Sequence, residues 1–178
     1  SCLVYPNKNG IYTPLKGFCL DFWINPRYSN ESKDADYHAG TIFHMSSSMC
    51  VSLVSGSGRD QNNLVDTFKI LVQLSQSADT SPTNINLSSP DSSKPNNLIF
   101  TSSYALNKNY WHHVLLQWDP NNDSSDVSLY VDSKKTVFNI PSSSLTTTNE
   151  IIVLGNYLKT SLAQAGKLFN SVTAAKDG

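Results

Sequence analysis

The chain has 178 residues and a formal net charge of −1, from 13 basic and 14 acidic side chains. The charges are balanced and scattered, which argues against a nucleic-acid partner, because proteins that bind nucleic acids neutralise the phosphates with clustered Lys and Arg. No apolar run reaches the roughly 18 residues of a membrane span, so we expect no membrane insertion. One hydrophobic core is expected for this length, which predicts a single domain over residues 1–178, cut from a larger protein.

Apolar and polar residues alternate along most of the chain, which predicts strands with an inner and an outer face. The first clear strand covers residues 18–24 and ends at the turn residues Asn25 and Pro26. Two more follow at residues 49–53 and 68–74, separated by the turn Gly56-Ser57-Gly58. Polar stretches at residues 28–39 and 75–97 are expected to form long surface excursions, which are often functional.

The second half of the chain continues the pattern. Residues 110–118 are apolar on both faces, as expected for a central strand, and residues 127–131 alternate again. The Lys134-Lys135 pair is expected in a solvated turn, and the spacing of apolar residues predicts one short helix near 158–169. Many short strands without helical crossovers predict an all-β fold, an antiparallel jelly-roll-type β-sandwich.

The motifs of the strand around Trp111 are more specific. Residues 106–114 read LNKNYWHHV, residues 117–119 read QWD, and residues 127–132 read VSLYVD. With residues 18–26, FCLDFWINP, this order resembles the concanavalin A-like lectin/glucanase superfamily, in its laminin-G/pentraxin-like branch, over residues 17–156. The resemblance implies a β-sandwich that carries glycan or protein ligands on loops at one rim.

The chain departs from the family pattern in two places. Ser133 stands where the family's hairpin has a glycine, and the family's closing strand is absent before Gly178. Either residues outside the chain complete the domain, or the last strand has diverged. In the first case the chain forms a sandwich that is incomplete at its C-terminal end, which would expose a strand edge.

Aromatic, histidine and cysteine residues in the strands have structural interpretations. The tryptophans at 23, 111 and 118 are expected to fill the core, so Trp111→Ala should cost about 3–5 kcal/mol. His112 and His113 lie on opposite faces of one strand, where packing and hydrogen bonding are expected rather than one shared metal. Cys19 and Cys50 are expected to be small buried hydrophobes, and a disulfide between them is left open.

The sequence offers little for catalysis, so we expect no enzyme and assign no catalytic residue. Retaining glucanases need two carboxyl groups roughly 5 Å apart. Glu31 and Glu150 are the only glutamates and do not form the acidic cluster of such enzymes. The segment Ser55 to Gly58 lacks the spacing of a nucleophile elbow, and the histidines lack a paired cysteine motif for zinc.

The candidate ligand-binding residues lie in two predicted loops: Tyr28, Tyr37, Asp119, Asn121 and Asp123. The loop after residue 118 offers side-chain oxygens at alternating positions, which makes calcium the most credible ion. An EF-hand is excluded, because Tyr130 stands where the bidentate glutamate belongs. No cofactor is otherwise predicted, and no metal ligands are assigned.

Three functions are compatible with these observations. The first is a recognition domain that binds a glycan or a neighbouring protein subunit through its rim loops, within an oligomeric surface assembly. The second is a purely structural virion, phage-tail or decoration component, which the Ser- and Asn-rich composition also fits. The third, a relative of the glycoside hydrolases, is disfavoured by the scarcity of carboxylates. A virion surface or an extracellular location is favoured.

Overall fold

The computed structural model describes residues 2–7, 17–27, 39–79, 98–119, 126–139 and 151–155. These ranges contain β-strands and one short 3-10 helix, η3, which spans Ser75–Asp79. No helix in them is long and apolar enough to cross a membrane. The strands are β1 (Cys2–Pro6), β2 (Phe18–Ile24), β3 (Ala39–Met45), β4 (Met49–Ser55), β5 (Thr67–Leu74), β6 (Ile99–Thr101), β7 (Leu106–Asn107), β8 (His112–Trp118), β9 (Asp126–Val131), β10 (Lys134–Asn139) and β11 (Ile151–Gly155).

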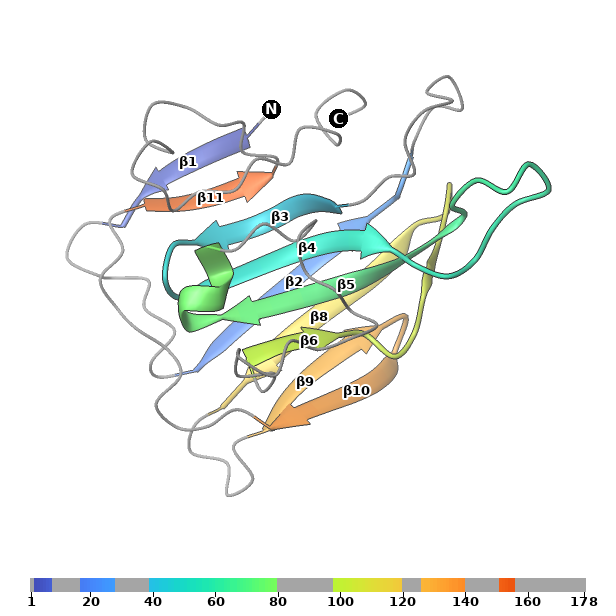
Figure 1. Cartoon of the computed structure of the whole chain (residues 1–178). Helices are drawn as coiled ribbons and strands as arrows, with labels where there is room; N and C mark the ends of the chain where they lie inside the picture. The colour runs from blue at the N-terminus through green and yellow to red at the C-terminus, as the bar shows by residue number, and fades with distance from the viewer. Residues whose placement is uncertain are drawn as a thin grey trace.

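The strands form two antiparallel sheets that pack face to face (Figure 1). The larger sheet has the order β1-β11-β3-β4-β5-β6, with β7 also paired to β5, and the smaller has the order β10-β9-β8-β2. The predicted all-β antiparallel sandwich is confirmed. Both the helix expected at 158–169 and the C-terminal end of the domain lie outside the described residues.

Strand alternation builds the core between the sheets. The side chains of Val114 and Leu116 on β8 point inward with those of Val127 and Leu129 on β9, and all four are nearly or fully buried. The facing side chains come from β5, where Phe68, Ile70, Val72 and Leu74 are fully buried. Strand β4 ends before Gly56, as predicted, but the chain does not turn there. The Gly56 amide donates to the Thr67 carbonyl at 2.8 Å, Arg59 pairs with Val65, and the turn lies at residues 60–63.

Strand β4 is buried on both faces, although its alternation predicts one polar face. Cys50 and Ser52 lie on the face away from the core, yet both are 0% exposed. The reason for Cys50 is η3, whose Ala78 packs against it. Cys50 therefore meets the prediction of burial, but Cys19, on the outer face of β2, is exposed. Both thiols are free, and they belong to different sheets.

The three tryptophans do not share one environment. Trp118 is only 8% exposed and packs against Phe18, with ring centroids 5.9 Å apart, as predicted. Trp23 and Trp111 are 65% and 63% exposed, so the prediction that they fill the core is wrong. The alternation accounts for this, because the inward positions beside them are taken by Ile24 and His112.

The β9–β10 hairpin turns over two residues, Asp132 and Ser133, with φ angles of 48° and 66°. Positive φ at both positions is the geometry of a type I′ turn, which matches the twist of a hairpin. The lysine pair expected in a turn instead begins β10. The Lys134 ammonium lies over the Tyr104 ring and that of Lys135 over the Tyr130 ring, at 5.2 and 5.8 Å.

Candidate functional site

One end of the smaller sheet exposes three aromatic side chains. Trp23 lies near the end of β2, and Tyr110 and Trp111 directly precede β8. Tyr110 is 66% exposed, much like the two indoles. Large aromatic side chains usually bury most of their surface, so a group of them left in water indicates a recognition surface. We call Trp23, Tyr110, Trp111 and His113 the aromatic patch.

The register of β2 and β8 places three members of the aromatic patch, Trp23, Trp111 and His113, on one face of the smaller sheet. Trp23 pairs directly with His113, and their rings lie 5.2 Å apart at 39°. Trp111 is two residues before His113 and shares its outer face, which makes it the diagonal neighbour of Trp23. Diagonal neighbours in an antiparallel pair lie about 7–8 Å apart, within reach of two indole rings.

Polar groups border the aromatic patch. His113 Nε2 lies 2.8 Å from Asp21 Oδ1, and the two side chains are 30% and 57% exposed. Asp21 is two residues before Trp23 and shares its face. A carboxylate that accepts hydrogen bonds and an imidazole that can donate or accept them therefore stand beside the indole of Trp23.

A second histidine–aspartate pair, His112 and Asp132, lies behind the aromatic patch. His112 points inward, 5% exposed, and its Nδ1 lies 2.6 Å from Asp132 Oδ2. The other oxygen of Asp132 accepts the His113 backbone N–H at 3.0 Å. Burial acts to raise the pKa of Asp132, but the hydrogen bonds from His112 and His113 outweigh it and hold that pKa below 3.8.

The segment that carries Tyr110 and Trp111 is tied down by backbone hydrogen bonds. The Asn109 amide donates to the Pro26 carbonyl at 2.9 Å, which joins the segment to the chain just after Trp23. The Lys108 amide donates to the Asp66 carbonyl at 2.8 Å, which joins it to the larger sheet. The two tryptophans are thus presented by elements that are fixed to each other.

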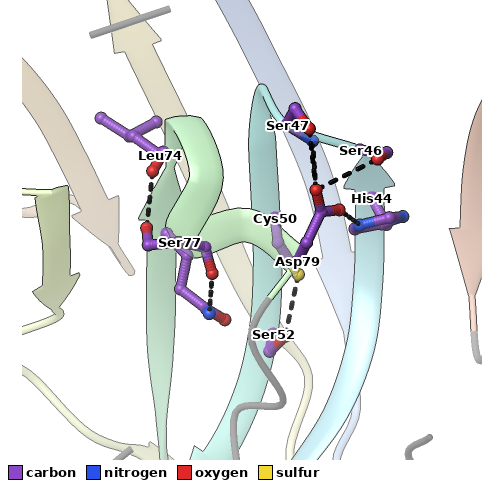
Figure 2. Close-up of polar contacts among 9 residues, drawn as sticks. His44, Ser46, Ser47, Cys50, Ser52, Leu74, Ser77 and Asp79 are labelled. Atoms are coloured by element: carbon purple, nitrogen blue, oxygen red, sulfur yellow. Dashed lines mark hydrogen bonds and ion pairs between the residues drawn. The ribbon is translucent and has the colours of Figure 1, made fainter. Parts of the chain in front are cut away.

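A separate polar cluster on the larger sheet combines histidine, aspartate and serine (Figure 2). Asp79 Oδ1 lies 3.2 Å from His44 Nε2. Asp79 Oδ2 accepts hydrogen bonds from the Ser46 hydroxyl at 3.1 Å, and from the Ser47 amide and hydroxyl, each at 2.9 Å. We call this cluster the Asp79 latch, because it fastens the end of η3 to the β3–β4 turn.

The Asp79 latch does not activate a nucleophile. Its serine hydroxyls donate to the carboxylate and not to the imidazole, whereas a hydrolase needs the imidazole to take the serine proton. The nearby thiol of Cys50 is also unreactive, because burial raises its pKa to about 12. The hydrogen bond with the Ser52 hydroxyl at 3.4 Å acts to lower this pKa, but burial outweighs it. The latch is a structural device that closes η3 over the sheet.

A comparison with protein-family models matches the laminin G domain to residues 38–171, which is more than half of the chain. The chain belongs to the laminin G domain family. This family is part of the concanavalin A-like lectin/glucanase superfamily, so the predicted resemblance is confirmed. Laminin G domains are in general non-enzymatic and bind glycans or proteins. A search of curated proteins found no match to this chain.

Little of the site predicted from the sequence can be placed in this laminin G domain. Asp119 is exposed and follows β8 at the end opposite to Trp111. The two residues are eight positions apart along extended chain, about 26 Å, so Asp119 does not belong to the aromatic patch. The other four predicted residues, Tyr28, Tyr37, Asn121 and Asp123, lie outside the described residues.

Calcium remains a prediction. In the described ranges, no three His, Cys, Asp or Glu side chains gather as a metal site would require. Residues 120–125, which carry most of the predicted oxygen donors, are outside those ranges.

Sequence reasoning missed the aromatic patch, although one signal was available. The alternation of β2 already placed Trp23 on the face opposite Phe22 and Ile24.

Proposed function

We propose that this laminin G domain recognises glycans through the aromatic patch, as a non-catalytic binding module of a larger surface assembly. The observation that carries the proposal is the exposure of two indole rings, each about two-thirds open to solvent, at one end of one sheet.

The chemistry of the aromatic patch suits a sugar ring. A pyranose has a face lined by C–H groups, which can lie against an indole ring and exclude water from both. Its hydroxyl groups point outward from the ring edge, where they need donors and acceptors. Asp21 and His113 supply these groups next to Trp23, and both side chains are open to solvent.

A second candidate function, packing against neighbouring protein subunits, is favoured by a different surface. Leu3, Val4 and Tyr5 of β1 are 60%, 51% and 48% exposed, and β1 is the last strand of the larger sheet in the described part of the chain. An apolar edge strand of this kind can pair with a strand of another chain. Because β1 and the aromatic patch belong to different sheets, separate variants can test the two functions.

The test is a glycan array probed with the wild-type domain and with Trp23→Ala and Trp111→Ala. Each exposed indole is expected to contribute to binding, so each variant should weaken capture of the best-bound glycan at least about tenfold. Melting temperatures should stay close to the parent value, because neither ring is buried. Tyr5→Ala is the matched control, since it removes a half-exposed aromatic side chain from the other sheet.

Two results would contradict glycan recognition: no saturable binding to any arrayed glycan, or full binding by the two tryptophan variants. If Tyr5→Ala instead lowers the molecular mass measured by light scattering, packing between subunits through β1 is the better account.

A further inference from the structure

The segment of residues 107–111, which carries Tyr110 and Trp111, rests on a side chain that a ligand of the aromatic patch would not touch. His112 is 5% exposed and faces the interior. Its Nε2 lies 2.8 Å from the backbone nitrogen of Asn107 and 3.0 Å from the backbone oxygen of the same residue. A single ring nitrogen therefore meets both a donor and an acceptor at the start of the segment.

The carboxylate of Asp132 decides which of these two contacts is a hydrogen bond. A carboxylate only accepts, so Nδ1 of His112 must carry a proton to make the 2.6 Å contact. In the neutral ring, Nε2 then has a free lone pair and accepts the Asn107 N–H. The position of one proton on His112 thus decides which backbone group of Asn107, the N–H or the carbonyl, forms the hydrogen bond with Nε2.

We propose that His112 and Asp132 are positioning residues for the aromatic patch: through the Asn107 N–H, they set how the segment 107–111 presents Trp111 to a ligand. The identity of the ligand in this inference, a glycan, rests on the function proposed above. The positioning itself needs no ligand and can be measured without one.

The other contacts of Asp132 support this role. Its second oxygen holds the backbone of His113, so one carboxylate reaches both the segment 107–111 and a member of the aromatic patch. Asp132 is also the first residue of the β9–β10 turn, which fixes its backbone at a φ of 48°. The ammonium group of Lys134 also acts on this carboxylate and favours its charged form.

Asp132→Asn changes which nitrogen of the His112 ring carries the proton, with almost no change in side-chain volume. The amide nitrogen can donate to Nδ1 of His112, which moves the ring proton to Nε2. Nε2 can then no longer accept the Asn107 N–H and must face the Asn107 carbonyl instead. Asparagine tolerates a positive φ as well as aspartate does, so the turn should be kept.

The experiment uses the full chain labelled with 5-fluorotryptophan, whose three ¹⁹F signals report on Trp23, Trp111 and Trp118. Asp132→Asn is expected to shift or broaden the Trp111 signal and to leave that of the buried Trp118 in place. The matched control is Asp126→Asn, the same change at the far end of β9, where Asp126 accepts only a long 3.4 Å hydrogen bond from Asn139 among its described contacts. This control should leave both signals unchanged.

Affinity gives the second readout. For the glycan best bound on the array, Asp132→Asn should raise the Kd about tenfold, which corresponds to 1.4 kcal/mol. Asp126→Asn should leave the Kd unchanged, and both variants should melt close to the parent temperature.

Each result has a distinct meaning. A Trp111 signal that stays in place in Asp132→Asn overturns the positioning role, as does a shift that Asp126→Asn reproduces. A shifted Trp111 signal, in a domain that binds no glycan, upholds the positioning role and refutes only the proposed function. If Asp132→Asn does not fold, His112→Gln, which also breaks the contact with Asp132, must shift the Trp111 signal, and an unmoved signal there overturns the proposal.

Discussion

Removing the carboxylate of the Asp79 latch should release η3 from the larger sheet. In Asp79→Ala, four hydrogen bonds to the carboxylate are lost at once. The serine hydroxyls are partly exposed and can turn to water, whereas the ring of His44 is only 2% exposed and loses its contact with the carboxylate inside the fold. A hydrogen bond to a charged group contributes about 1.5–3 kcal/mol. We therefore expect a loss of about 3 kcal/mol in the free energy of unfolding.

The effect should depend on pH in a defined direction. Burial acts to raise the pKa of Asp79, but hydrogen bonds from His44, Ser47 and Ser46 outweigh it and hold the pKa below 3.8. A carboxylate with a lowered pKa in the folded state stabilises the fold above its unfolded pKa, about 3.9. This contribution is lost as the pH falls through the folded value. The difference between wild type and Asp79→Ala should therefore be largest near neutral pH and should shrink below about pH 4.

Urea denaturation followed by tryptophan fluorescence measures this difference, at pH 7 and at several values below pH 4. Because Trp118 is buried in the core, its emission reports global unfolding. The slope against urea should stay constant between the two proteins, so that the midpoint alone carries the change. The stabilising role of the Asp79 latch would be refuted if the unfolding free energy of Asp79→Ala lies within about 0.5 kcal/mol of the parent value at pH 7. It would also be refuted if the difference between the two proteins is the same at pH 7 and below pH 4.

Three further predictions follow from single side chains. In urea denaturation, Trp118→Ala should cost about 3–5 kcal/mol because the ring fills the core, whereas Trp111→Ala should stay within about 0.5 kcal/mol. Ser133→Gly should raise stability by about 0.5–1 kcal/mol, seen as a higher melting temperature, because the position has a φ of 66°. In native protein at pH 7, mass spectrometry should find Cys19 alkylated by iodoacetamide and Cys50 unmodified, since burial and a pKa of about 12 leave Cys50 almost no thiolate.

Period-two alternation was enough to predict most of the sandwich. Residues 18–24, 49–53, 68–74 and 127–131 all fall within strands of the structure. The opposite orientations of His112 and His113 also follow from alternation, and each ring makes the hydrogen bonds expected of it. Local pattern succeeds here because each strand buries one face against a neighbouring layer.

The aromatic patch shows where this reasoning failed. Tryptophan usually fills a core, but in β2 the inner face is already occupied by Phe22 and Ile24, so Trp23 faces outward. For Trp111 the inner position belongs to the polar His112, which Asp132 and the Asn107 backbone satisfy. Hydrogen bonds between residues 20 positions apart leave no local pattern in the sequence.

The Asp79 latch could not be predicted for the same reason. Asp79 stands at the start of a long polar stretch and has no special neighbours in the sequence. Its partners are 32 to 35 residues earlier, and only the pairing of β3, β4 and β5 brings them together. With η3 held in this place, its Ala78 covers Cys50 on the outer face of β4.

The central claim is that a glycan lies on the outer face of the smaller sheet, at Trp23 and Trp111. The most direct measurement follows the indole N–H signals of the three tryptophans by ¹⁵N–¹H NMR while the best-bound arrayed glycan is added. Our account predicts that the signals of Trp23 and Trp111 move with the same saturation curve and that the signal of Trp118 stays in place. Saturable binding that leaves the Trp23 and Trp111 signals unmoved would contradict it.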